Sequence, residues 1–392
     1  MQTKRLGYIN RVIIPNLFFF FFVAQIFSPY IFGVTLYLEV VIALLDANFF
    51  IWLLRGKKKP LFAILLILPI LFMRPSISIK LLCLIISVSY LKYSYLNNCF
   101  LLKQYFLLSI FVAIAQFALY YTIPELSIVL GPQNISEYIW GEYATITNTN
   151  FYEAITGIIR VSGLSREAGF FASLLNCVVL YYYLECRTVG IKLSWAYKFF
   201  LFLAYIISFS KMSLLLFPML IIISLRKQIN TIPVYVIISL FYFIQLVVWY
   251  HSQFLLTDGN ETFTHRFGAY GILPDYNNII DLIFGVKEVT YHQFTGTYAK
   301  QYFEIIEGLG PFGGMGAYIV YNGIVLTVLL FALLIHTGIS STGLLLLLLL
   351  TINVQLDTNQ NFVVLAYFIV FKYFLVNSYY VCRRKYQAAD RR

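Results

Sequence analysis

The sequence is poor in charged residues, which make up only 11% of its 392 positions. A soluble domain carries about 25% charged residues, so this chain lacks the charge that would cover a water-facing surface. Hydrophobic residues make up 60% of the chain and aromatic residues 19%, and the mean hydropathy is +0.80. This balance excludes a soluble enzyme, a disordered protein and a nucleic-acid-binding domain, and it indicates a polytopic membrane protein.

Cysteine and clustered metal ligands are also scarce. The chain has five cysteines, none of them in a long polar stretch, so we expect no disulfide scaffold. His251, His265 and His292 are separated by 14 and 27 residues, which does not match a short metal-ligand motif. The long polar stretches contain no Asp-x-Asp pair that would hold a divalent ion against a diphosphate. We therefore expect neither a metal nor another cofactor.

Apolar segments recur along the whole chain. A transmembrane helix needs about 20 apolar residues. Windows of that length mark twelve segments, at 12–31, 33–54, 60–73, 77–91, 99–122, 167–185, 193–208, 211–225, 232–250, 312–335, 337–355 and 361–380. The shortest of them are expected to be tilted or partial helices. The sequence thus predicts an all-α fold, with one transmembrane domain over residues 1–392 and about 12 transmembrane helices.

Basic clusters alternate with these segments in a consistent way. They lie in the first residues and at 55–59, 187–192, 226–227 and 383–385. Alternating spans put all of them on one side, and put the two long polar stretches, 124–166 and 251–311, on the other. The positive-inside rule therefore predicts cytoplasmic N- and C-termini and two large outer loops. The net charge of +11 follows from this topology, so no nucleic-acid partner is expected.

The end of the first outer loop carries residues suited to a phosphate. Arg160 and Arg166 lie six residues apart, and Glu167 opens the next apolar segment. Guanidinium groups bind phosphate bidentately, and free amides at a helix N-terminus add positive potential. The alternative is that these arginines anchor the loop at lipid headgroups or pair with loop carboxylates. We expect the preceding stretch, Phe151–Ile159, to lie on the membrane surface as an amphipathic helix.

Other candidates lie at the outer ends of later segments. Lys211 follows Ser210 in a short polar turn, where an ammonium group needs solvent or a partner unless it snorkels. In the second outer loop, His265 or His292 can accept a proton from a sugar hydroxyl, although a structural role is the alternative for each. Arg266 follows His265 directly.

Two carboxylates and one glycine-rich stretch complete the candidates. Glu39 and Asp46 share one helical face, where they can form a proton relay or pair with Lys80 or Lys103. Asp46 can instead simply lie near the inner boundary. Gly308–Gly316 lacks the Lys-Ser/Thr ending of a nucleotide-binding loop, so a tight turn with close backbone packing is expected.

At these residues the chain resembles a Wzy-type O-antigen polymerase of the bacterial inner membrane. That family is grouped with the O-antigen ligases among the GT-C-type glycosyltransferases. The resemblance is carried by Arg160-x-x-Gly163-x-x-x-Glu167, by Ser210-Lys211, and by His265-Arg266 with the later Leu282–Gly285 turn. Ala168 stands where the family commonly has proline. The layout of spans and two large outer loops is also similar.

The resemblance implies a GT-C-like fold with a periplasmic active site. A growing glycan on undecaprenyl diphosphate would be transferred, with inversion and without a metal, to the non-reducing sugar of another lipid-linked repeat unit. The implied roles are diphosphate binding by Arg160, Arg166, Lys211 and Arg266, proton acceptance by Glu167, His265 or His292, and substrate binding by Gly163 and Ser210. Besides membrane lipid and the lipid-linked donor and acceptor, a chain-length-regulating co-polymerase is an implied partner.

Two other functions are compatible with the sequence. An O-antigen ligase would use the same donor but would glycosylate lipid A-core. A lipid-linked oligosaccharide flippase would also have about a dozen spans, but it predicts short loops on both sides and charges lining a central cavity. The two long outer loops, with arginines at the mouths of spans, favour a transferase.

Overall fold

Most of the described chain is helical. The computed structural model describes residues 12–31, 34–55, 75–144, 152–155, 157–252, 261–285, 314–350, 352 and 354–376. These residues form 17 α-helices and two short β-hairpins. Five helices are long and apolar enough to cross a membrane, namely Ile77–Leu96, Leu102–Thr122, Ala168–Thr188, Val234–His251 and Gly314–His336. The expectation of a helical membrane protein is confirmed, and the count of about 12 spans stays a prediction.

The chain divides into two compact units. The first contains residues 1–218 and 357–369, and the second contains residues 219–356 and 370–392. Their boundary falls inside helix α21 (Asn361–Tyr373), which belongs to the first unit at its N-terminal end. The two units are described separately below, and the prediction of a single transmembrane domain stays a prediction.

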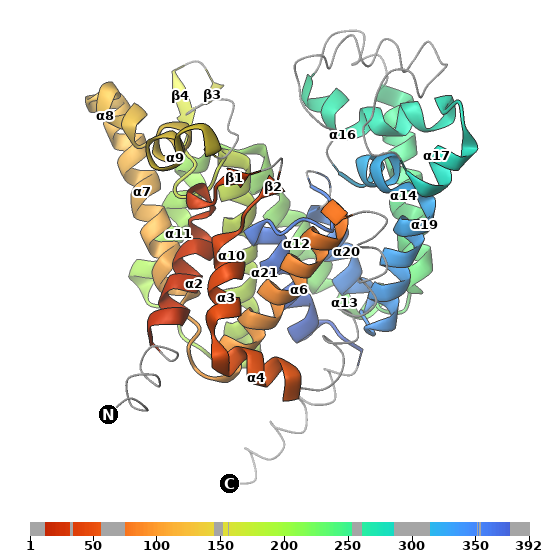
Figure 1. Cartoon of the computed structure of the whole chain (residues 1–392), viewed down its shortest axis with the longest axis horizontal. Coiled ribbons are helices and arrows are strands. Elements are labelled where there is room, and N and C mark those ends of the chain that lie inside the picture. The colour runs from red at the N-terminus through yellow and green to blue at the C-terminus, as the bar shows by residue number, and fades with distance from the viewer. Residues whose placement is uncertain are drawn as a thin grey trace. The chain divides into compact units, whose positions relative to one another are not determined.

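The first unit is built from antiparallel helices and two hairpins (Figure 1). Its elements are α2 (Ile14–Val23), η2 (Gln25–Phe27), β1 (Tyr30–Ile31), β2 (Val34–Thr35), α3 (Leu38–Leu45), α4 (Ala47–Arg55), α6 (Pro75–Leu96), α7 (Leu102–Thr122), α8 (Pro124–Val129), α9 (Pro132–Trp140), η3 (Gly141–Tyr143), β3 (Tyr152–Ile155), β4 (Ile158–Arg160), α10 (Ala168–Thr188), α11 (Trp195–Ser208), η4 (Lys211–Leu215) and the start of α12 (Leu216–Ser224), which continues in the second unit after Pro218. The end of this unit that holds α8, α9, β3 and β4 is called the loop end; α4 lies at the opposite end.

The stretch Phe151–Ile159 is not the amphipathic helix that the sequence predicted. Its described residues pair as an antiparallel hairpin in which Tyr152 lies opposite Arg160. Gly157, in the turn, has a φ of +77°, which glycine adopts without steric cost. The β-branched isoleucines on both sides favour extended backbone. The glycine turn and the β-branched side chains therefore favour a hairpin in this apolar stretch over the amphipathic helix.

The predicted span 33–54 is interrupted at Asp46. Its Oδ1 accepts hydrogen bonds from the backbone amides of Asn48 and Phe49, at 3.0 and 3.2 Å, at the start of α4. Its Oδ2 accepts a hydrogen bond from the Tyr90 hydroxyl at 3.0 Å. A side chain that accepts the free amides of a first turn is a helix cap. Asp46 therefore has a structural role, ending α3 and starting α4.

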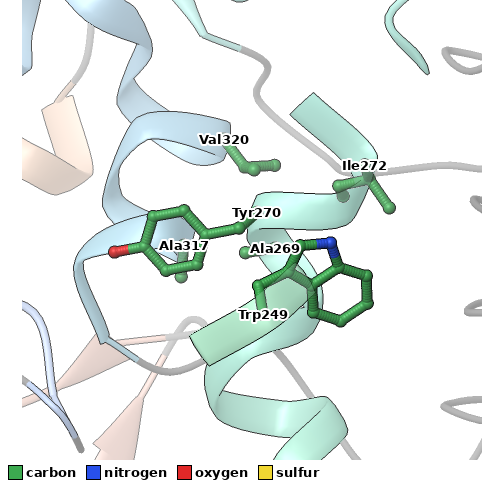
Figure 2. Packing of buried hydrophobic residues seen from close by; sticks show 6 residues of the cluster. All are labelled: Trp249, Ala269, Tyr270, Ile272, Ala317 and Val320. Atoms are coloured by element: carbon green, nitrogen blue, oxygen red, sulfur yellow. The ribbon is translucent and has the colours of Figure 1, made fainter. Parts of the chain in front are cut away.

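The second unit packs its helices around aromatic residues (Figure 2). Its elements are α13 (Arg226–Ile229), α14 (Val234–Ser252), α16 (Glu261–Ile272), η5 (Leu273–Asp275), α17 (Ile279–Phe284), α19 (Gly314–His336) and α20 (Ser341–Leu350). Trp249 of α14 and Tyr270 of α16 share a buried cluster with Ala317 and Val320 of α19. A Cβ on Gly316 would lie only 2.8 Å from the Tyr270 ring, so the expected close packing is confirmed at that position of the glycine-rich stretch.

In this unit the backbone at Gly285 packs directly against the backbone at Gly323. Gly285 ends α17 with a φ of +75°, and Gly323 kinks α19 with a φ of +76°. A Cβ on Gly285 would overlap the Tyr321 carbonyl oxygen, and a Cβ on Gly323 would overlap the Ile283 carbonyl oxygen. The Leu282–Gly285 turn thus has a packing role, and the predicted span 312–335 is kinked rather than continuous.

Replacing Gly285 by alanine should destabilise the protein strongly. Alanine would add both left-handed strain and overpacking, together about 2 to 5 kcal/mol. Gly338→Ala is the matched control, because Gly338 has a φ of +78° but no atom within 4 Å of its Cβ position. Thermal unfolding of detergent-purified protein should show a larger loss for Gly285→Ala than for Gly338→Ala. Equal losses would mean that the backbone crossing contributes nothing.

Candidate functional site

The loop between β4 and α10, residues 161–167, is held by one side chain of α7. The amide of Gly163 donates to Gln116 Oε1 at 2.8 Å, and Gln116 Nε2 donates to the Gly163 carbonyl at 3.0 Å. One residue further on, the Leu164 amide donates to Ser109 Oγ at 3.0 Å. Buried backbone groups outside regular structure need such partners. The two polar side chains of α7 therefore fix the path of the loop.

Gly163 occupies a position that only glycine fits. Its φ is +54°, and a Cβ there would lie 2.7 Å from Ser109 Oγ and 2.8 Å from the Ser109 carbonyl oxygen. Its amide and carbonyl are both bonded to Gln116. The structure gives Gly163 a role in shaping the loop, which the sequence did not indicate. Its part in substrate binding stays a prediction.

The loop also packs against the end of α2. Leu164 shares a buried cluster with Ala24 and Ile26, and the Ile26 amide donates to the Leu164 carbonyl at 3.4 Å. From α9, the Trp140 indole nitrogen donates to the Phe27 carbonyl at 2.9 Å. These contacts bring the loop, the start of α10 and the residues after α2 together at the loop end.

Arg166 is buried, and part of its guanidinium has no hydrogen-bond partner in the described part of the chain. Its side chain is 9% exposed, and its Nε and Nη2 atoms are buried without a hydrogen-bond partner among the described residues. Its guanidinium carbon lies 5.8 Å from the centre of the Tyr37 ring, within the range of a cation–π interaction. Burying a charge is costly unless it is paired and hydrogen-bonded. Arg166 therefore has donors ready for an anion.

Arg160 and Glu167 lie within electrostatic reach of this position. Arg160 ends β4 and is half-buried, whereas Glu167 precedes α10 and is exposed. Partial desolvation by the surrounding protein raises the pKa of Glu167, and the charges of Arg166 and Arg160 act in the opposite direction. The three residues predicted together from the sequence are thus brought together by the fold.

A buried polar cluster that the sequence did not predict lies beside Arg166. Glu39 Oε1 accepts hydrogen bonds from Gln25 Nε2 at 3.2 Å and from Asn359 Nδ2 at 3.1 Å. The same Gln25 nitrogen donates to the Asn359 carbonyl at 3.0 Å. Tyr37 interacts electrostatically with Arg166, with Glu39 and with Asp357, and Arg166 attracts Glu39. Segments from opposite ends of the chain therefore meet here.

Neither suggested lysine is a hydrogen-bond partner of Glu39. Its carboxylate is bonded to two amide side chains instead. Lys103 lies over the Tyr197 ring, with its Nζ 5.1 Å from the ring centre. Lys80 acts electrostatically on Asp357. Of the two carboxylates on the predicted span, Glu39 belongs to this cluster and Asp46 is a cap.

The missed segment is Asp357–Asn361, which precedes α21. Asp357, Asn359 and Asn361 are each at most 1% exposed. The signal was present in the sequence, because five consecutive polar residues interrupt two strongly apolar segments. The segment lies at the junction of the predicted spans 337–355 and 361–380, where a hydropathy window registers only a connection between two apolar helices. Buried polar residues in a membrane protein are functional candidates by default.

The start of α21 packs against α10. The ring centres of Phe170, at the start of α10, and Phe362, at the start of α21, are 5.5 Å apart. Cys177 Sγ of α10 contacts the Phe362 carbonyl at 3.4 Å. Helix N-termini present unbonded amides and a positive potential that favour anions. With Arg166 directly before α10, this arrangement suits a phosphate or diphosphate.

Ser210 and Lys211 belong to a turn that packs against a later part of α10. Ser210 is buried, and its Oγ accepts the Met212 amide at 3.3 Å, whereas Lys211 is exposed. Asn176 Nδ2 donates to the Met212 carbonyl at 2.7 Å. Since Asn176 is eight residues beyond Ala168, this turn lies about 12 Å along the helix from its start.

The other candidates belong to the second unit or lie outside the described residues. Arg266 is half-buried in α16, where burial lowers its pKa. His265 belongs to the same helix, but its side chain lies outside the described residues, as does all of His292. Their participation in one site with Arg166 stays a prediction. Among the side chains that the structure describes, no group of three or more His, Cys, Asp or Glu could hold a metal ion.

No family model, no curated protein and no solved structure matches this chain. The resemblance described above therefore depends on the short motifs alone, and the function below is argued from the geometry around Arg166.

Replacing Gln116 by leucine should release the loop that carries Arg166. Leucine has a similar size but leaves the buried amide and carbonyl of Gly163 unbonded, which costs about 1 to 3 kcal/mol for each group. Hydrogen exchange of a peptide covering residues 158–168 should become faster. Gln133→Leu is the control, since the Gln133 side chain bonds only the exposed Glu137. Unchanged exchange in Gln116→Leu would show that other contacts hold the loop.

Proposed function

We propose that this chain is a membrane glycosyltransferase that polymerises O-antigen or similar surface-polysaccharide repeat units. It transfers the growing glycan from undecaprenyl diphosphate to the non-reducing end of another lipid-linked repeat unit. The observation that carries the proposal is Arg166, a buried guanidinium two residues before the N-terminus of α10, whose Nε and Nη2 atoms have no hydrogen-bond partner among the described residues. An anion completes such a site better than any other group.

The reaction needs positive charge at the leaving group. When the bond between the sugar and the diphosphate breaks, negative charge develops on the diphosphate oxygens. Donors fixed in advance in a poorly solvated site stabilise this charge more than water does. Arg166 is fixed through its loop by Gln116, and Arg160 lies within electrostatic reach of the same place. Lys211 and Arg266 are proposed to contribute further positive charge.

The proposed chemistry is an in-line displacement with inversion. The acceptor hydroxyl attacks the anomeric carbon, the carbon–oxygen bond to the diphosphate breaks, and the electron pair leaves with the diphosphate. The hydroxyl proton passes to Glu167, or in the alternative to His265 or His292. The lipid diphosphate bond supplies the energy, and the proposal is metal-independent because the outer loops lack an Asp-x-Asp pair.

The length of α10 supports a periplasmic site in the inner membrane. Its 21 residues extend about 31 Å, close to the thickness of the hydrocarbon core. Glu167 lies before one end and Arg187 lies in the last turn of the other. The positive-inside rule puts Arg187 in the cytoplasm, and therefore puts Arg166 at the periplasmic face. Both termini would then be cytoplasmic, and a chain-length-regulating co-polymerase is a proposed partner.

Reconstitution tests this proposal directly. Purified protein in vesicles, supplied with lipid-linked repeat units and EDTA, should give a ladder of lengthening glycan on a gel. Arg166→Ala should lower the rate about 100-fold or more, as removal of a transition-state donor does. Arg166→Lys should restore only part of it, because lysine lacks the bidentate fork. Arg187→Ala, which removes an exposed arginine at the far end of α10, should keep the wild-type rate.

Other outcomes of this assay identify the competing functions. Full activity of Arg166→Ala would refute the diphosphate assignment. Transfer of single chains to lipid A-core, without a ladder, would indicate an O-antigen ligase. Movement of intact lipid-linked glycan across the bilayer, without a new product, would indicate a flippase.

The role of Glu167 can be tested by its pH dependence. A carboxylate base works above its pKa and is lost as the pH falls through it. Because its surroundings raise the pKa of Glu167, the wild-type rate should fall on the acid side at a higher pH than for an ordinary glutamate. Glu167→Gln should lower the rate about 100-fold or more, and Glu125→Gln, an exposed carboxylate of α8, should not. Retained activity would transfer the role to a histidine.

A further inference from the structure

Four buried side-chain oxygens, of Glu39 and of the segment before α21, have no hydrogen-bond partner among the described residues. They are Glu39 Oε2, Asp357 Oδ1, Asn359 Oδ1 and Gln360 Oε1, and these four residues are called the acceptor cluster. Glu39 and Asn359 are 0% exposed, Asp357 is 1% exposed and Gln360 is 9% exposed. Nearly all buried polar groups in folded proteins are hydrogen-bonded, and an unbonded one costs about 1 to 3 kcal/mol. Several such acceptors together therefore require a donor from outside.

The acceptor cluster is held rigidly. Gln25 donates to Glu39 and to the Asn359 backbone, and accepts the Asn361 amide at 3.3 Å through its Oε1. The Asn361 side chain in turn accepts the Phe362 amide at 2.8 Å and so caps α21. These bonds fix Gln25, Glu39 and the backbone of Asn359 and Asn361, and none of them uses the four oxygens. Groups fixed in this way lose little entropy when a ligand binds.

The charges around the acceptor cluster select the kind of donor. Arg166 acts electrostatically on Glu39 and Tyr37, and Lys80 acts on Asp357, so both cations oppose a metal ion or an ammonium group at this place. An anion is opposed by the carboxylates of Glu39 and Asp357. A neutral hydroxyl group donates to these oxygens without either penalty. A molecule with several hydroxyl groups next to a phosphate would satisfy the cluster and Arg166 at the same time.

We infer that the acceptor cluster binds the hydroxyl groups of a sugar whose phosphate is held by Arg166. This inference rests on the proposed function and assigns sugar recognition to residues that none of the sequence motifs contains. Arg166 and Gln360 each keep 9% exposure, whereas Glu39 and Asn359 keep none. Arg166 and Gln360 are therefore more accessible to an entering ligand than Glu39 and Asn359.

Binding of two lipids tests the inference. The full chain, reconstituted in nanodiscs, is titrated with undecaprenyl diphosphate and with the undecaprenyl-diphosphate-linked glycan extracted from the host membrane. Glu39→Gln and Gln360→Ala should bind the sugar-bearing lipid about 10-fold more weakly, as expected for a lost hydrogen bond to a charged or buried group. Both should bind undecaprenyl diphosphate within about 2-fold of wild type. Gln360→Ala breaks no existing side-chain hydrogen bond, so it keeps the test valid if Glu39→Gln misfolds.

Matched variants separate this inference from the proposed function. Glu185→Gln changes another fully buried carboxylate of the first unit and should bind both lipids normally. Arg166→Ala should lose both lipids. If wild type binds neither lipid, the proposed function itself fails. If wild type binds both equally, if the cluster variants lose undecaprenyl diphosphate as well, or if glycan binding requires added Na⁺ or K⁺, sugar recognition by this cluster is wrong.

Discussion

The pair of hydrogen bonds between the Gln116 side chain and the Gly163 backbone holds the candidate site together. A primary amide offers one donor and one acceptor side by side, which matches the amide and carbonyl of a single residue. Gln116 also donates to the Leu130 carbonyl, and its own carbonyl accepts the Ser127 hydroxyl, so the same residue ties down the start of the outer loop. One side chain in α7 thereby sets both the loop and the direction from which α10 begins.

The electrostatics of the site follow from this fixed backbone. Arg166 is withdrawn from water but does not form an ion pair with Glu39, although the two attract one another. Glu39 is already committed through one oxygen to Gln25 and Asn359. Within the described part of the chain, the guanidinium therefore keeps two donors without a partner, and the N-terminus of α10 adds to its positive potential. A lysine ammonium is a compact and strongly hydrated charge, so it would replace the planar guanidinium poorly in a buried site.

Part of this site could be predicted because charge is so rare in the chain. Against an apolar background, Arg160, Arg166 and Glu167 stand out, and their spacing already favoured a phosphate. The residues that hold them did not stand out. Gln116 lies 47 positions from Gly163 and Gln25 lies 334 positions from Asn359, and single amides barely alter the hydropathy of a segment. Their importance depends on contacts that only the folded chain creates.

The helical fold could be predicted from hydropathy for the same reason, but its interruptions could not. Averaging over about 20 residues hides a single polar residue such as Asp46, and a single glycine such as Gly323. Both end or bend a helix through local backbone chemistry: Asp46 by accepting free amides, and Gly323 by adopting a positive φ. Hydropathy therefore locates the apolar segments, and backbone hydrogen bonding decides how many pieces each segment forms.

Under the proposed function, the interruptions would also let one site hold a substrate with three chemically different parts. A lipid-linked glycan has an apolar chain, an anionic diphosphate and a polyhydroxylated head. In the first unit, irregular backbone before α10 carries Arg166, and irregular backbone before α21 carries Asp357 and Asn359. The apolar faces of the helices begin directly below, with Phe170 and Phe362 in contact. Continuous helices would have left no irregular polar backbone, whereas the breaks before α10 and before α21 place polar groups next to the apolar faces of these helices.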